Sequence, residues 1–182
     1  MERNRLLAIV VATLVVLGAL YYRLSSSAPV DKQSEGLTMP IVQEPGSEHS
    51  HASIIMLVNG NVIDFNQARY VERSEYAHIH DNSPYFIHKH AKGVTLHYFL
   101  ETIGVKITSD CIYLDNFQFC NKESAKLTIL INRVKFNPEY LPYYEIKDGD
   151  KILIDYGNHN EQELLMEANG IADLDPDLLQ NE

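Results

Sequence analysis

A single segment with helical periodicity lies between segments of strand character. Apolar residues recur at helical spacing at Leu96, Phe99, Leu100 and Ile103. The other apolar segments of the domain are short and rich in β-branched or aromatic residues. They cover 52–58, 61–65, 76–80, 85–90, 111–114, 117–120, 127–132 and 151–156. One helix among many strands predicts an α+β domain in which the helix packs against a sheet.

Turn and capping residues fix where several of these elements meet. Asn59 and Gly60 are a strong hairpin signal and join the first two strand segments. Gly93 or Thr95 can cap the start of the helix, and Gly104 can end it. The domain therefore begins with a hairpin, continues through one helix and ends in further strands.

This order resembles the β-grasp, or ubiquitin-like, fold over roughly residues 52–157. The residues that carry the resemblance are Gly93 to Leu96, Phe99 and Leu100, Ile131 and Asn132, and Tyr144 to Asp150. The pattern is similar to substrate-binding β-grasp families and to membrane-anchored prokaryotic proteins, some of which carry a protein-disulfide isomerase label. The resemblance implies a β-grasp-like mixed sheet with one packed helix, but a fold of this kind does not fix an activity.

The first residues predict a membrane anchor. Residues 6–22 form a run of 17 residues without a charge, and Arg3 and Arg5 precede it. This length is at the short end of what spans a bilayer, and the positive-inside rule leaves the N-terminus in the cytoplasm. A cleaved signal peptide is the alternative, although Pro29 follows Ala28, the best small residue for cleavage. Either interpretation places the domain outside the cytoplasm.

The charge of the chain is unevenly distributed. The net charge is −10, of which residues 161–182 carry −7, so we expect an acidic tail there.

The chain is predicted to divide into four parts. They are a transmembrane anchor at 1–24, a flexible linker at 25–48, the domain at 49–160, and the acidic tail at 161–182 with one short helix ending near Gly170. Because no basic face appears, nucleic acid is not an expected partner, whereas the membrane and an envelope protein are.

Six of the eight histidines form three His-x-His pairs, which are His49 and His51, His78 and His80, and His88 and His90. Residues i and i+2 of a strand point to the same face, so each pair presents two imidazoles side by side. Such pairs suit a transition metal, here copper or zinc. A solvated sheet face that is rich in histidine is the alternative.

The hairpin register decides whether four of these histidines share one face. If Ile79 and Ile87 both point into the core, His78 pairs with His88, and His78, His80, His88 and His90 lie together on the other face. A shift of one residue would separate the pairs. Either Asp81 or the pair His49 and His51 is expected to complete the metal site.

The two cysteines bracket a short hairpin. With Asp115 and Asn116 as its turn, Cys111 falls directly opposite Cys120, and an oxidising compartment favours a disulfide. A redox-active pair is more often Cys-x-x-Cys at a helix N-terminus, so the spacing favours a structural disulfide over a catalytic one.

Three functional hypotheses follow. The first is a membrane-tethered domain that binds copper or zinc and is not an enzyme. The second is a protein-interaction module in which the histidines are incidental or form a pH-sensitive patch. The third, least supported by the spacing, is a thiol-disulfide isomerase that uses Cys111 and Cys120.

Overall fold

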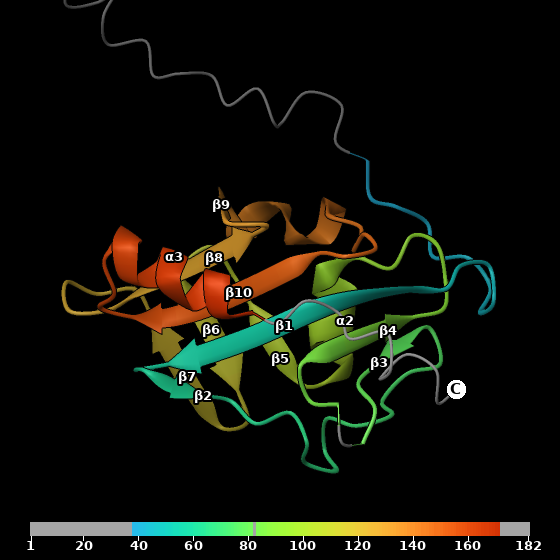
Figure 1. Ribbon diagram of the computed structural model, residues 1–182, viewed down its shortest axis with the longest axis horizontal. Coiled ribbons are helices and arrows are strands. Elements are labelled where there is room, and N and C mark those ends of the chain that lie inside the picture. Colours follow the sequence, from blue (N-terminus) through green and yellow to red (C-terminus); the bar gives the residue numbers. More distant parts are fainter. Residues whose placement is uncertain (1–37, 82, 172–182) are drawn as a thin grey trace, which may run out of the picture. The chain divides into compact units, whose positions relative to one another are not determined.

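The computed structural model describes residues 38–81 and 83–171. The main sheet has the strand order β3-β4-β1-β10-β8-β9, and β2 pairs with β1 (Figure 1). Its strands are β1 (Ser50–Val58), β2 (Asn61–Val62), β3 (Ala77–His78), β4 (Phe86–Lys89), β8 (Lys126–Ile131), β9 (Val134–Phe136) and β10 (Lys151–Gly157). A second sheet contains β5 (Val105–Ile107), β6 (Cys111–Leu114) and β7 (Phe117–Cys120). The helices are α2 (Leu96–Thr102), the 3-10 helix η1 (Pro138–Tyr143) and α3 (Glu161–Gly170).

The predicted mixed α+β architecture with a helix packed on the sheet is confirmed. β1 and β10 run parallel at the centre, and the other pairs of the main sheet are antiparallel. One face of the sheet packs on α2, where Ile54 and Ile154 share a buried cluster with Phe99. Thr95, one of the two caps that the sequence allows, is the N-cap of α2 and accepts a hydrogen bond from the Tyr98 amide. Burial of each large apolar side chain contributes about 1.5–3 kcal/mol to folding.

The opposite face of the sheet is partly covered by α3. Figure 1 shows α3 in front of the sheet, whereas α2 and the β5-β6-β7 sheet lie behind it. Leu164 and Ala168 of α3 are buried against Leu57, Leu130 and Leu153. The predicted helix ending near Gly170 is present, but it packs on the domain that we expected to end at residue 160. The acidic residues of α3 are exposed or partly exposed to solvent, whereas Leu164 and Ala168 are buried.

The chain also joins the domain before residue 49. The Gln43 amide donates to the Lys92 carbonyl over 2.9 Å, and the Gly46 amide donates to the His90 carbonyl over 2.7 Å. Gly93 has a φ of 80°, and a Cβ there would collide with the carbonyl oxygen of Ile41. The part of the predicted flexible linker from residue 41 to 48 is thus held against the domain by backbone contacts, which composition does not reveal.

The predicted anchor at residues 6–22 lies outside the described residues, as do residues 25–37 of the predicted linker. Within the described part of the chain, no helix is both long enough and apolar enough to cross a membrane.

The predicted disulfide between Cys111 and Cys120 is confirmed. The two cysteines are directly opposite each other on β6 and β7, in the register predicted from the Asp115–Asn116 turn. A disulfide lowers the entropy of the unfolded chain by closing a loop.

Replacing Cys111 and Cys120 with serine should therefore lower the free energy of unfolding by about 2–3 kcal/mol, the value that loop closure predicts for a ring of this size. Urea unfolding with and without reductant measures the effect. Reductant should destabilise the native protein by a similar amount and leave the serine variant unchanged. Equal stability of the native protein and the serine variant in the absence of reductant would contradict a structural role for the disulfide.

Candidate metal centre

The hairpin of β3 and β4 has the register that places the histidines together. His78 pairs with His88, as predicted, and the His90 amide donates to the Tyr76 carbonyl over 2.9 Å. Ile79 and Ile87 are fully buried in the core on the side of α2. Because side chains alternate along a strand, the four histidines of the hairpin point to the other face, which α3 covers at its far end.

β1 brings the third His-x-His pair to the same place. His51 pairs with His88, so the first residues of β1 lie beside β4. Ala52 and Ile54 point into the core, and His51 therefore shares the face of the hairpin histidines.

The six imidazoles form a closed circuit of ring contacts, which we call the histidine cluster. Around the circuit, the distances between ring centroids are 4.7 Å for His49–His51, 4.8 Å for His51–His88, 4.2 Å for His88–His80, 4.7 Å for His80–His78, 5.0 Å for His78–His90 and 5.1 Å for His90–His49. All three predicted pairs thus lie together. His51, His78 and His88 are buried, and His49 is exposed.

A carboxylate that the sequence analysis missed joins the histidine cluster. Within the described residues, candidate ligand atoms of Glu72, His78 and His80 all lie within 4.8 Å of one another. The Oε1 atom of Glu72 is 2.7 Å from His80 Nδ1, and its Oε2 atom is 3.5 Å from His78 Nε2. Two imidazoles and a carboxylate are a ligand set that zinc uses in proteins.

Glu72 reaches the hairpin through a tight turn in the loop before β3. Its amide donates to the Ile79 carbonyl over 3.0 Å, and the neighbouring Val71 forms an isolated bridge with Ile79. Glu72 has a φ of 51°, in the left-handed region that non-glycine residues rarely adopt. No periodic pattern in the sequence marks this residue, and only the folded loop reveals it.

Hydrogen bonds determine which nitrogen of His78 faces the centre of the group. Its Nδ1 lies 2.8 Å from the Ser74 carbonyl oxygen. Because a carbonyl can only accept, Nδ1 carries the proton, and the neutral ring then presents a lone pair at Nε2. A backbone carbonyl in this role commonly orients a metal-ligating histidine.

His80 is oriented in the same way by Glu72. Its Nδ1 donates to the carboxylate, so the neutral ring also presents a lone pair at Nε2. The Nε2 atoms of His78 and His80 are 3.3 Å apart. Two lone pairs at this distance repel unless a proton or a metal ion lies between them.

The distance between the two nitrogens matches a tetrahedral metal site. Zn–N bonds of about 2.0–2.1 Å at tetrahedral angles place neighbouring ligand nitrogens about 3.3–3.4 Å apart. Neighbouring nitrogens of a square-planar Cu(II) site with similar bond lengths lie about 2.8 Å apart. The observed 3.3 Å therefore fits a tetrahedral ion better than a square-planar one.

The other two histidines lie outside the histidine cluster. His97 on α2 is 3.5 Å from Glu101, and His159 is 3.0 Å from the buried Asp155. Burial raises the pKa of Asp155, and the nearby His159 opposes that shift. His97 and His159 therefore each lie beside a carboxylate of their own and are not members of the candidate site.

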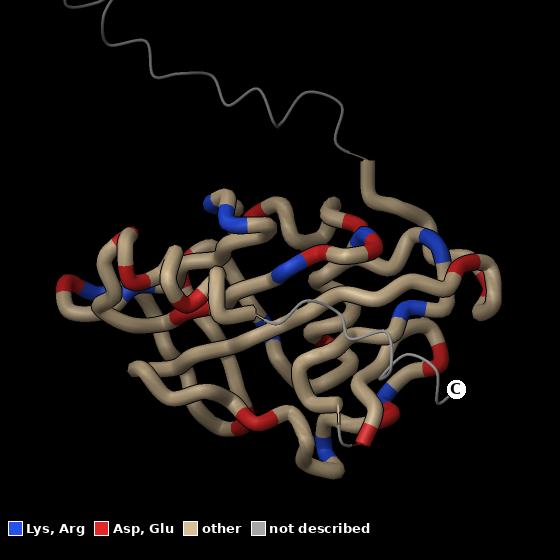
Figure 2. Tube along the Cα trace, in the orientation of Figure 1, with Lys and Arg blue, Asp and Glu red and all other residues tan. Residues whose placement is uncertain are grey.

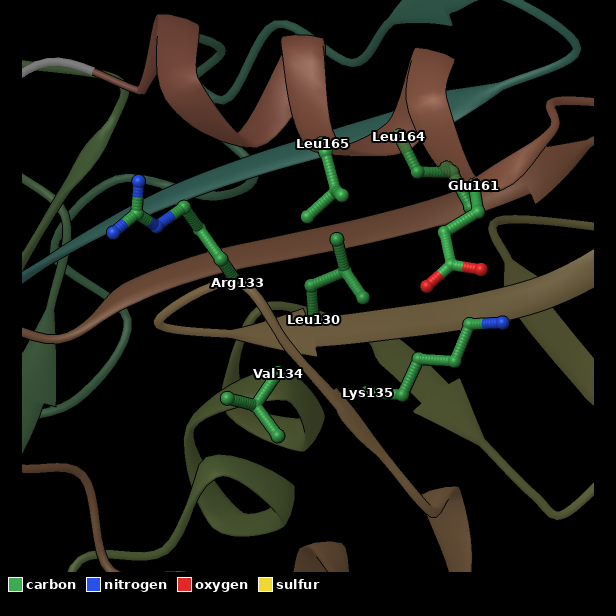
Figure 3. A pocket seen from close by; sticks show the side chains of 7 residues that line it. All are labelled: Leu130, Arg133, Val134, Lys135, Glu161, Leu164 and Leu165. Carbon is green, nitrogen blue, oxygen red and sulfur yellow. The ribbon is translucent and has the colours of Figure 1, made fainter.

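Other surface features of the described residues offer less chemistry. A groove of about 300 Å³ lies between α3 and the β8–β9 hairpin, and it is mostly apolar. Figure 3 shows Leu130 and Leu165 pointing toward one another in this groove, with Glu161 near Lys135 at one end. Figure 2 shows basic and acidic residues spread among strands and loops rather than gathered on one element.

Comparison of the chain with protein-family models, with curated proteins and with solved structures found no match.

Proposed function

We propose that this protein is a membrane-tethered, extracytoplasmic domain that binds a transition metal, copper or zinc, at a site whose nitrogen spacing suits tetrahedral zinc, and is not an enzyme. The single observation that carries the proposal is the 3.3 Å separation of the Nε2 atoms of His78 and His80, whose other nitrogens both donate hydrogen bonds. Glu72 Oε2 and a rotated His88 supply the two further ligands that a four-coordinate ion needs.

The tether and the fold name belong to the same proposal. The apolar run at residues 6–22, preceded by Arg3 and Arg5, supports an anchor with its N-terminus in the cytoplasm. The central parallel pair of β1 and β10, flanked by antiparallel strands with α2 across one face, supports a β-grasp-like fold. An envelope protein is the partner that this location favours.

The second candidate function is a pH-sensitive interaction patch. A proton shared between His78 and His80 would relieve the same repulsion that a metal ion relieves, and Glu72 would stabilise the resulting charge. A thiol-disulfide isomerase is the weaker alternative, because Cys111 and Cys120 lie on adjacent strands rather than at the N-terminus of a helix.

Calorimetric titration of the full chain in detergent, with Zn(II) and separately with Cu(II), tests the proposal. We expect replacement of His78 and His80 by alanine to weaken the tightest zinc binding at least 100-fold, because two directly bound imidazoles are lost. His97→Ala is the matched control, since it removes a histidine outside the histidine cluster. Lower pH should weaken binding, because protons compete for imidazole nitrogen.

Glu72→Gly separates the role of the carboxylate from that of the turn. Glycine adopts a positive φ without strain, so this variant should fold normally and still bind zinc about 10- to 100-fold more weakly. Absence of both zinc and copper binding by the native chain would refute the metal hypothesis and favour the proton-sharing patch. Unchanged affinity in the His78/His80 variant would remove these two histidines from the site.

A further inference from the structure

The histidine cluster contains more ligands than one ion uses. A structural zinc ion takes four ligands. The six imidazoles and the Glu72 carboxylate supply seven candidate groups. An ion beside Glu72, His78 and His80 leaves a second group of imidazoles at the β1 side of the histidine cluster, namely His49, His51 and His90.

One ring pair of this second group has the same separation as the ring pair of the first. The ring centroids of His49 and His51 are 4.7 Å apart, the same separation as for His78 and His80. His49 and His90 are separated by 5.1 Å. Among the described residues, only Glu72, His78 and His80 have candidate ligand atoms that already lie within 4.8 Å of one another, so an ion in the second group requires its imidazole rings to rotate toward a common centre.

Backbone contacts hold the second group in place. The His90 carbonyl accepts hydrogen bonds from the Gly46 amide over 2.7 Å and from the Glu48 amide over 3.4 Å. The Glu48 carboxylate is 2.9 Å from the buried Lys89, the residue before His90. These contacts fix the segment that carries His49 beside the end of β4.

His51 is fixed by the loop before β10. Its amide donates to Asp148 Oδ1 over 3.0 Å, and its carbonyl accepts from the Gly149 amide over 2.8 Å. The second group is therefore anchored by three separate chain segments, which limits how far its imidazoles can move apart.

We infer that the histidine cluster binds two transition-metal ions, with a second Zn(II)-class site formed by His49, His51 and His90. The inference rests on the proposed function, since it requires that the first site bind metal. β3 and β1 lie on either side of β4, so the two ions are separated by up to two strand spacings, about 10 Å. Repulsion between two dications makes the second ion bind more weakly than the first.

Native mass spectrometry of the full chain released from detergent, titrated with Zn(II) alone, counts the bound ions. We expect two ions in the native chain. His49→Gln with His90→Gln should leave one ion, and so should Glu72→Gly with His80→Gln. Combining the four substitutions should leave none, and His97→Gln should keep two. Glutamine preserves side-chain size and polarity, and His49→Gln alone, at an exposed position, also tests the second site if the double variant does not fold.

The outcomes distinguish this inference from the proposed function. One ion in the native chain, retained in the His49/His90 variant and lost in the Glu72/His80 variant, would overturn the second site and leave the first intact. Two ions retained in the His49/His90 variant would also overturn it, because the second ion would then lie elsewhere. No bound ion in the native chain would refute the proposed function itself.

Discussion

Replacing Lys89 with methionine should lower the free energy of unfolding by about 3 kcal/mol, since breaking a buried ion pair from one side costs about 3–5 kcal/mol and partial exposure of its carboxylates reduces this. The Lys89 side chain is only 1% exposed. Its Nζ is 2.9 Å from Glu48, 3.0 Å from Glu145 and 2.8 Å from the Ile146 carbonyl. Methionine has a similar volume but leaves all three acceptors without this donor.

The contacts of Lys89 connect three parts of the chain. They join β4 to the segment before β1 and to the segment before β10, so their loss should loosen the edge of the sheet that holds the histidine cluster. Urea unfolding measures the change, and Lys126→Met, at an exposed position of β8, is the control with an expected change below about 0.5 kcal/mol. Similar stability of the two variants would show that the buried ammonium contributes little.

Glu145 adds a pH dependence to this prediction. Burial alone would raise its pKa, but the Gly93 amide and Lys89 together hold the pKa below the ordinary value. A carboxylate with a lowered pKa in the folded state stabilises the protein above the pKa of its unfolded state, and this stabilisation is lost as the pH falls through the lowered pKa. The native protein should therefore lose stability in acid more steeply than Lys89→Met.

The sequence predicted the parts of the site that depend on strand parity. Ile79 and Ile87 each have one compatible face, and taking them as cross-strand partners in the core predicted the pairing of His78 with His88, which the structure has. The Cys111–Cys120 pairing followed in the same way from counting outward from a two-residue turn. In both cases the alternation of side chains between the two faces of a strand determined which residues pair.

The sequence did not predict contacts that depend on irregular backbone. Glu72 reaches His80 through a loop turn with positive φ, for which glutamate is an unusual residue. Residues 43–48 are held by backbone hydrogen bonds, and their polar composition is compatible with a free linker as well. The short strands β5 and β9 also escaped prediction, because three residues are too few to establish a period.

The packing of α3 on the sheet could have been predicted from its apolar residues, but the negative charge of the segment favoured an exposed tail. Leu164, Ala168 and Ile171 recur at intervals of four and three residues, the spacing of one helix face, and all three are buried. The acidic residues between them favour an exposed tail when net charge alone is considered. An apolar stripe therefore says more about the position of a short helix than its net charge does.

Saturating Zn(II) should raise the free energy of unfolding by about 4 kcal/mol when free zinc is 1,000-fold above the dissociation constant, because an ion that binds only the folded state shifts the folding equilibrium. For a domain of this size the melting temperature should rise by about 8–16 °C. The unfolded chain does not hold the ion in this way, because the proposed ligands come from the Glu72 loop and the β3–β4 hairpin, which separate on unfolding.

Thermal unfolding of the full chain with zinc, with magnesium and with excess chelator measures this stabilisation. Magnesium should have no comparable effect, since it prefers oxygen ligands and binds imidazole poorly. The variant with alanine at His78 and His80 should lose most of the zinc effect, whereas His97→Ala should retain it, because His97 pairs with Glu101 outside the histidine cluster. Equal stabilisation of the native chain and the His78/His80 variant would place the bound zinc elsewhere, because an ion held between these two nitrogens cannot stabilise a fold that lacks them.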